Sequence, residues 1–205
     1  MIVESLLLLS MIFAIVGIES SRFAYSRFGI GFSVLFSAFA TFLLGSISLA
    51  LFQLVVLGIL VLTLVAVLEN KFNVTYDLDP LQGPLSNVVL LSTAASVFLA
   101  VCSVSSSFSN GVAGALLSVA GYSLILKQNV LKIVLGLILL QCGGSIVMML
   151  LNIPTLPTIA LFNFAVTGLE FFLLKYALKI QQMHSTLNFR SLRLTSRSDN
   201  IRRPD

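Results

Sequence analysis

The stretch that decides the fold runs from Gly29 to Leu68 and reads GIGFSVLFSAFATFLLGSISLALFQLVVLGILVLTLVAVL. It contains no charged residue. It is about twice as long as the roughly 20 residues that one helix needs to cross a bilayer. Its one cluster of turn-forming residues is Gly45-Ser46-Ile47-Ser48, near the middle. The stretch therefore predicts a hairpin of two transmembrane helices.

The composition extends this interpretation to the whole chain. Of 205 residues, 58% are hydrophobic and only 10% are charged, whereas a soluble domain carries about 25% charged residues. The many large apolar residues exclude a disordered chain, and two cysteines are too few for a disulfide-stapled secreted module. We therefore expect an all-α fold, a polytopic bundle of transmembrane helices.

Further apolar runs on both sides of the hairpin bring the expected number of helices to about seven. The first run, at about 2–18, ends without a small-residue cleavage site, so we expect a retained helix and not a signal peptide. The segment 69–86 contains charged residues and prolines, which indicate the longest internal loop. The remaining runs lie at about 87–106, 111–126, 133–151 and 158–178.

The basic residues are confined to one side of this arrangement. With the C-terminus inside, the inner segments are 19–28, 69–86, 127–132 and the tail, and all twelve Lys and Arg lie in them or at the inner ends of helices. Lys and Arg are enriched on the cytoplasmic side of membrane proteins. We therefore expect a multi-pass protein of the cytoplasmic membrane, with its N-terminus outside and its C-terminus in the cytoplasm.

The basic tail and the two cysteines have simple interpretations. Arginines that follow an apolar helix are typical of a segment that meets anionic lipid headgroups, so we expect the tail to contact the bilayer and not nucleic acid. Cys102 and Cys142 lie inside apolar runs, with no second Cys or His at metal-ligand spacing, so we expect both to be small core residues. We expect no metal, no cofactor and no catalytic residue in this chain.

A stripe of small residues on the fifth run favours close helix packing. Small residues let helices approach closely in lipid, where contacts between large apolar side chains gain little. We expect a second helix against this stripe, and a lining for a water path is the alternative. The stripe consists of Gly111, Gly114, Ser118 and Gly121, which share one helix face.

Glu170 is the only acidic residue well inside an apolar run. A carboxylate in hydrocarbon is costly and must face protein, water or a partner. Asn163 and Thr167 lie on the same helix face as Glu170, at a spacing of i, i+4 and i+7, and Gln141 of the preceding helix is the expected polar neighbour. This set is a candidate proton pathway. A structural role for Glu170, paired with Lys175 or another subunit, is the alternative.

Three segments resemble subunits of redox-linked membrane complexes. Residues 126–137, LKQNVLKIVLGL, resemble the turn and following helix of the three-helix complex I subunit known as NADH-quinone oxidoreductase subunit K. Over residues 18–190, the chain is more similar to component E of hydrogenase-4, a seven-span membrane subunit of formate hydrogenlyase-type complexes. The other two segments are Ser20-Ser21-Arg22-Phe23 and the ending Ala177-Leu178-Lys179-Ile180 with His184-Ser185-Thr186-Leu187-Asn188.

The resemblance implies both a division of the chain and a function. Residues 1–107 would form a four-helix membrane part, 108–182 a three-helix part like the complex I subunit, and 183–205 a basic cytoplasmic tail. The chain would be a non-catalytic membrane-arm subunit of an energy-converting hydrogenase or complex I-like oxidoreductase, supporting proton translocation coupled to electron transfer elsewhere. Its partners would be antiporter-like subunits and subunits that anchor the quinone or hydrogenase module.

Some positions depart from the pattern of the hydrogenase subunit. Gln141 stands where that family has a glutamate, and Ala165 where it has an acid in the seventh helix, while Glu170 aligns with an acidic position of the complex I subunit. The missing acids favour the alternative of a purely structural scaffold. An autonomous small transporter or channel is a further alternative, although such folds typically show paired repeats with broken helices, which this sequence lacks.

The topology leads to a first prediction. Cysteines introduced at Ser46 and Thr155 should react with a membrane-impermeant thiol reagent added outside intact cells, and a cysteine at Asn73 should not, because only the first two positions lie in outer connections. Labelling is measured by mass shift of the purified protein. Reaction at Asn73 from the outer side would overturn the expected orientation.

Overall fold

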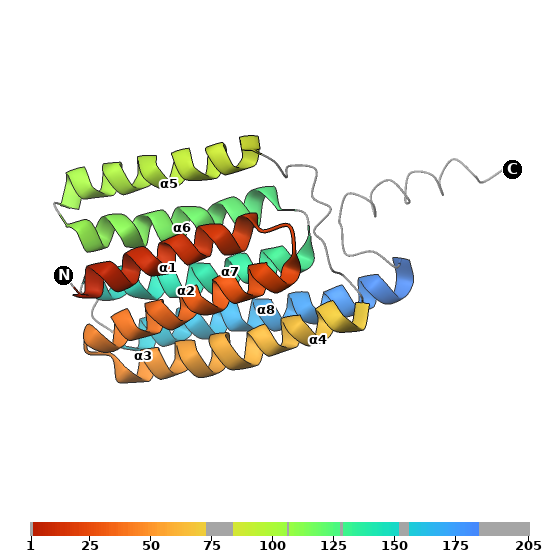
Figure 1. The fold of residues 1–205 in the computed structure, drawn as a ribbon. Coiled ribbons are helices and arrows are strands. Elements are labelled where there is room, and N and C mark those ends of the chain that lie inside the picture. The colour runs from red at the N-terminus through yellow and green to blue at the C-terminus, as the bar shows by residue number, and fades with distance from the viewer. Residues whose placement is uncertain (1, 73–83, 106, 128, 152–155, 185–205) are drawn as a thin grey trace, which may run out of the picture.

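A bundle of long helices makes up the structure, a computed structural model that describes residues 2–72, 84–105, 107–127, 129–151 and 156–184 (Figure 1). Within these residues, seven helical segments are long and apolar enough to cross a membrane, which confirms the expected all-α bundle. Large apolar side chains are exposed along the outer faces of the bundle, where a bilayer would cover them. The chain has the architecture of a multi-pass membrane protein.

The helices follow the apolar runs, with ends that differ from the expected ones by a few residues. Six spans are single helices: α1 (Ile2–Glu19), α2 (Phe23–Leu43), α5 (Pro84–Ser105), α6 (Phe108–Leu126), α7 (Val130–Leu150) and α8 (Leu156–His184). The third span is composite and consists of α3 (Ile47–Phe52), the π-helical segment η1 (Gln53–Val61) and α4 (Leu62–Phe72). The basic tail expected at 183–205 falls almost wholly outside the described residues.

Two turns show why the sequence breaks its helices where it does. Gly45 ends the hairpin's first helix with φ of +95°, a left-handed conformation that glycine adopts without strain. Asn129 precedes α7, and its side-chain oxygen accepts a hydrogen bond from the backbone N–H of Leu131 at 3.0 Å. Asparagine at this position satisfies an N–H that the helix itself leaves unpaired.

The π-helical segment in the middle of the third span is a feature that the sequence analysis did not predict. It covers Gln53–Val61 within an otherwise regular helix. π-Helical turns are rare and often occur at functional sites. Gln53, the first residue of the segment, is 1% exposed, so an amide is held inside the bundle where the helix changes its winding.

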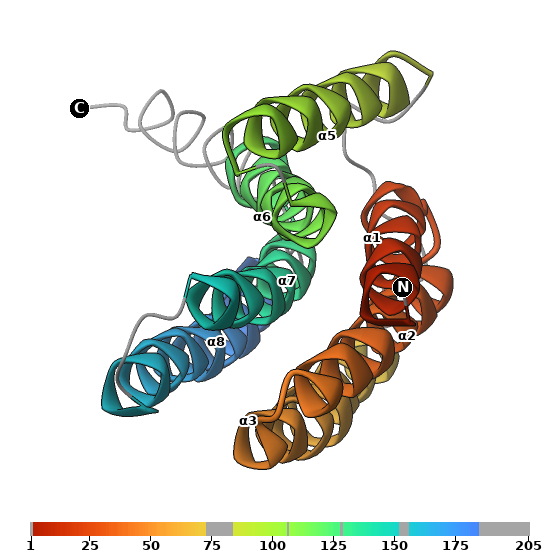
Figure 2. The ribbon, with the colours of Figure 1, turned by 90° about the vertical axis from the view of Figure 1, so that its left-hand side faces the viewer.

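Seen along the helix axes, the spans form two rows (Figure 2). One row contains α1, α2 and the third span, and the other contains α6, α7 and α8, with α5 packed against α6. The rows join where α1 packs on α6 and α2 on α7. Their shared core includes Ala14, Ile30, Val34, Leu57, Leu116, Val119, Val134, Leu135 and Ile138.

The backbones of α1 and α2 approach each other more closely than they could if both contact positions carried side chains. A Cβ atom added to Gly29 would lie 2.7 Å from Cα of Gly17 and 2.9 Å from the carbonyl oxygen of Phe13. The Ser26 hydroxyl donates to the Gly17 carbonyl oxygen at 2.5 Å. Two glycines that face each other therefore let the two backbones touch, which is the type of packing that associates helices in lipid.

The small-residue stripe of α6 meets a helix of the same chain along part of its length. A Cβ atom added to Gly114 would lie 3.0 Å from Cγ2 of Val101, and Gly111 faces the same helix, α5. Ser118 donates its hydroxyl hydrogen bond within α6. A Cβ atom on Gly121 would meet nothing within 4 Å in the described part of the chain. The stripe thus binds α5 at its first two glycines only.

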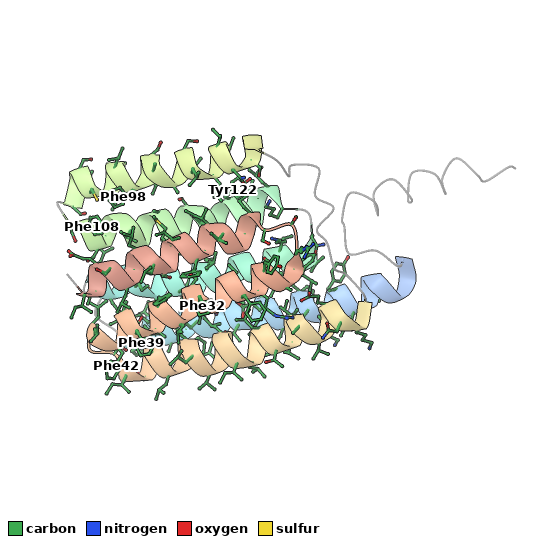
Figure 3. The ribbon with its side chains drawn as sticks, viewed as in Figure 1. Phe32, Phe39, Phe42, Phe98, Phe108 and Tyr122 are labelled. Carbon is green, nitrogen blue, oxygen red and sulfur yellow. The ribbon has the colours of Figure 1, made fainter. Side chains whose placement is uncertain are left out.

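Aromatic rings occupy both lipid-facing and packed positions (Figure 3). Phe32, Phe39 and Phe42 lie along α2 and are about half exposed, as expected for side chains in contact with lipid. Phe98 and Phe108 join α5 to α6, with ring centroids 5.4 Å apart in an edge-to-face arrangement, and Phe108 is also 43% exposed. Such pairs contribute about 0.5–1.5 kcal/mol beyond the area that they bury.

The glycine contact leads to a second prediction. Gly29→Ala should lower the free energy of unfolding by about 1–3 kcal/mol, because the new methyl group meets backbone atoms that cannot move aside. The change is measured by unfolding of the detergent-solubilised protein, followed by circular dichroism. Gly31→Ala is the matched control, since a Cβ atom there meets only a Leu62 methyl group at 3.5 Å. Equal stability of the two variants would contradict the prediction.

Candidate functional site

Glu170 lies on α8 and is completely buried, with 0% of its surface exposed. Neither of its carboxylate oxygens has a hydrogen-bond partner among the described residues. The expected alternative of pairing with Lys175 is not seen, because no ion pair joins the two residues and Lys175 is exposed. A buried carboxyl group without partners is rare in folded proteins and calls for a functional or structural explanation.

A track of hydrogen bonds joins α7 to α8 next to Glu170. Gln141 Nε2 donates to the carbonyl oxygen of Asn163 at 2.8 Å and to Thr167 Oγ1 at 2.9 Å. The side chains of Ser145 and Asn163 bond each other at 3.1–3.2 Å. The structure therefore brings Gln141, Asn163 and Thr167 together. Glu170 shares their helix face but is not hydrogen-bonded to Gln141, which was expected to be its neighbour.

A second polar group lies in the other row of helices. Gln53 Oε1 accepts hydrogen bonds from the hydroxyl groups of Thr41 at 3.1 Å and Ser37 at 3.4 Å. All three side chains are buried, and Gln53 Nε2 has no partner in the described part of the chain. The sequence analysis missed Gln53, although an amide within so apolar a run is itself a signal.

Cys142 lies between these two polar groups. Its thiol is beside the Ser37 side chain and within electrostatic reach of the Glu170 carboxyl group. Cys142 is 0% exposed, and the sequence analysis interpreted it as a small core residue. Cys142 of α7 thus brings a thiol next to Ser37 of α2, where the two rows pack on each other.

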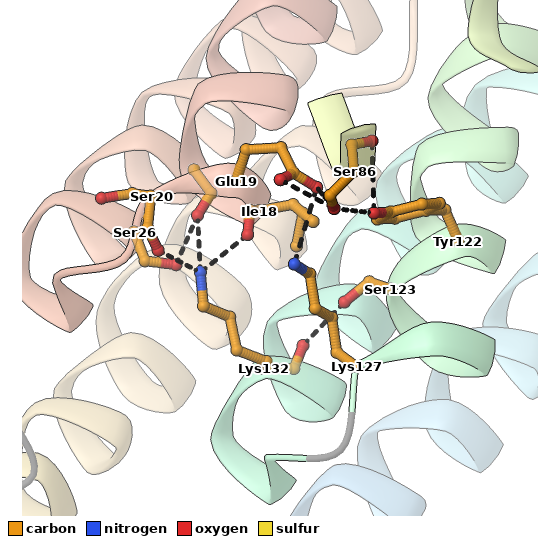
Figure 4. A network of polar contacts seen from close by, with 10 residues as sticks. Ile18, Glu19, Ser20, Ser26, Ser86, Tyr122, Ser123, Lys127 and Lys132 are labelled. Carbon is orange, nitrogen blue, oxygen red and sulfur yellow. Dashed lines mark hydrogen bonds and ion pairs between the residues drawn. The ribbon is translucent and has the colours of Figure 1, made fainter. Parts of the chain in front are cut away.

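A polar cluster holds the helix ends together at the membrane surface where α1 ends (Figure 4). Its centre is Lys132, which is 0% exposed in the first turn of α7. Lys132 Nζ donates to the carbonyl oxygens of Gly17 at 3.2 Å, Ile18 at 2.8 Å and Ser20 at 2.7 Å. These carbonyls lie at the C-terminal end of α1, where a positive charge is stabilised by the helix dipole.

The rest of this end cluster ties α1 to α5 and α6. Lys127 Nζ lies 3.6 Å from a Glu19 carboxylate oxygen. The Ser86 hydroxyl donates to the same carboxylate at 3.2–3.3 Å and is hydrogen-bonded to the Tyr122 hydroxyl. In the sequence, Lys127 and Lys132 serve as markers of the inner side and as part of the resemblance at 126–137, and they do not predict these contacts.

The first row has its own ion pair at the same end of the bundle. Arg27 Nη1 of α2 lies 2.8 Å from Oε2 of Glu69 on α4. The side chains are 23% and 10% exposed, so both charges are partly shielded from water. This pair holds the α2 and α4 ends of the predicted hairpin together.

The described residues do not contain a grouping of side chains typical of a metal site. No group of three or more His, Cys, Asp or Glu side chains lies close together there. No protein-family model, curated protein or solved structure matches this chain.

The end cluster leads to a third prediction. Lys132→Met keeps the length of the side chain but removes its donors, so it should lower the free energy of unfolding by at least about 1–3 kcal/mol, the cost of one carbonyl left buried without a partner. Unfolding of the detergent-solubilised protein measures the change. Lys179→Met, at an exposed lysine of α8, is the control. An Lys132→Met variant as stable as this control would show that the carbonyl contacts contribute little.

Proposed function

We propose that the chain is a non-catalytic membrane-arm subunit of an energy-converting hydrogenase or complex I-like oxidoreductase in the cytoplasmic membrane, and that Glu170 takes part in proton translocation there. The observation that carries this proposal is the fully buried Glu170 carboxyl group without a hydrogen-bond partner in the described residues. A carboxyl group that only holds helices together would be expected to bond to a neighbour.

The surrounding groups support a proton-handling role for Glu170. Gln141, Thr167 and Asn163 form a hydrogen-bonded track between α7 and α8, in which Thr167 lies one helical turn before Glu170. Gln53 and Ser37 form a second polar group in the other row. Hydroxyl and amide groups can both donate and accept hydrogen bonds. A side chain that gains and loses a proton next to such groups can exchange it along them, provided that electron transfer in another subunit supplies the free energy.

The partners in this proposal are other membrane subunits, both antiporter-like ones and those that anchor the quinone or hydrogenase module. The resemblance of residues 126–137 supports this class, and within that segment Asn129 caps α7 while Lys132 binds the end of α1. The least buried spans are α5 and α8. Their outer faces offer the most surface for lipid or for neighbouring subunits.

The proposed role of Glu170 leads to a fourth prediction. Glu170→Gln should lower proton translocation by about tenfold or more, because the amide has a similar size but cannot release a proton. Translocation is measured in sealed membrane vesicles and normalised to the amount of complex recovered by co-purification in mild detergent. Glu170→Asp keeps a titratable group and should retain part of the activity, and Thr167→Val tests the neighbouring track.

Two outcomes would contradict the proposal in different ways. Normal translocation by the Glu170→Gln complex would exclude an essential proton-carrying role and favour the structural scaffold. Co-purification of the wild-type chain without any iron–sulfur or antiporter-like partner would contradict the class of complex itself and favour an autonomous transporter or channel.

A further inference from the structure

A groove of about 670 Å³ runs along the outside of the bundle between α2 and the third span. Its walls include Phe32 and Leu35 of α2 and Ile59 and Leu62 of the third span. Apart from Arg27 and Thr63, its lining residues are apolar or glycine. The groove is open at the side, where Phe32 and Ile59 are 45% and 64% exposed, so it faces the hydrocarbon of the bilayer.

Two glycines keep the groove open. A Cβ atom on Gly58 would lie no closer than 3.6 Å to its neighbours, the Gln53 carbonyl oxygen and the Val34 Cγ1 atom. A Cβ atom on Gly31 would meet only a Leu62 methyl group at 3.5 Å. Larger residues would therefore fit sterically at both positions and would fill the groove. Gly58 also lies within the π-helical segment, whose altered winding shapes this wall.

The charges at one end of the groove favour an anionic group. Arg27 lines the groove and uses one guanidinium nitrogen to bond Glu69, although a guanidinium carries five N–H donors. Arg22 at the start of α2 and Lys71 near the end of α4 belong to the same end of the hairpin. Among the described residues of α2 and α4, these three basic residues stand against one acid, Glu69, and by the positive-inside rule this end lies on the cytoplasmic side.

The length of the groove fits a lipid as its occupant. The lining runs from Arg27 to Leu35 on α2 and from Leu54 to Ala66 on the third span, roughly 12 Å and 18 Å at about 1.5 Å per residue. The hydrocarbon core of a bilayer is about 30 Å thick, so the groove covers about one leaflet. A smaller hollow of about 180 Å³ continues beyond Leu54 along the hairpin, but its lining is wholly apolar. An acyl chain needs one leaflet, with its phosphate at the charged end.

We infer that this groove binds an anionic phospholipid of the cytoplasmic leaflet, with one acyl chain against Gly31 and Gly58 and the phosphate at Arg27. The guanidinium of Arg27 can bond a phosphate oxygen with donors that Glu69 does not use. Acyl chains gain little hydrophobic free energy on moving from bilayer to groove, so the headgroup contact determines which lipid binds. The inference does not depend on the proposed role of Glu170.

The fifth prediction tests this lipid site. The whole chain is placed in nanodiscs with equal amounts of phosphatidylglycerol and phosphatidylcholine. Native mass spectrometry then measures which lipid stays bound to the protein when the protein is released from the nanodisc. The wild type should retain phosphatidylglycerol preferentially. Gly58→Leu should reduce the retained lipid several-fold by filling the groove. Gly168→Leu, at an exposed glycine of α8 where a Cβ atom meets nothing within 4 Å, should behave like the wild type.

A second variant tests the headgroup contact without filling the groove. Arg27→Gln should lower the preference for phosphatidylglycerol about fivefold, the effect of one basic residue near an anionic surface, and Arg27→Lys should keep most of it. Equal lipid retention by Gly58→Leu and Gly168→Leu would overturn the inference. So would an unchanged lipid preference in Arg27→Gln, or a second polypeptide bound to the wild type and released by Gly58→Leu.

Discussion

Water is absent from the hydrocarbon core of a bilayer, so each polar group that the chain places there must find a partner within the protein. Much of the bundle can be understood from this constraint. Ser26 bonds the backbone of α1 where two glycines meet, Gln141 bonds across α7 and α8, and Lys132 bonds the open end of α1. The carboxyl group of Glu170, the amide nitrogen of Gln53 and the amide oxygen of Gln141 lack such partners among the described residues.

α7 is the helix on which both rows depend. It is the most buried span, with 67% of its apolar window inside the protein, against 11% for the span of α5 and 17% for that of α8. Lys132 at its first turn fixes α1, Cys142 near its middle faces α2, and Gln141 on a neighbouring face bonds α8. One helix therefore connects the end cluster at α1, the contact between Cys142 and Ser37, and the polar track near Glu170.

The sequence predicts the parts of this structure that follow from helical periodicity and from the thickness of a bilayer. The span positions and the shared face of Asn163, Thr167 and Glu170 are of this kind. The pairing of Gln53 with Thr41 depends on how two helices rotate against each other, which the spacing of residues does not define. The burial of Lys132 was missed for a different reason, because its partners are backbone carbonyls and leave no pattern of side chains.

The contact between Lys132 and the end of α1 also has a consequence for biosynthesis. Its donor and acceptors are 112–115 residues apart in the chain, and a ribosome makes the acceptors first. When α1 and α2 enter the membrane, the carbonyls at the end of α1 must therefore stay hydrated at the surface, because their lysine has not yet been synthesised. The first hairpin can pair early through its glycines, but the bundle closes only when α7 emerges and its lysine displaces that water.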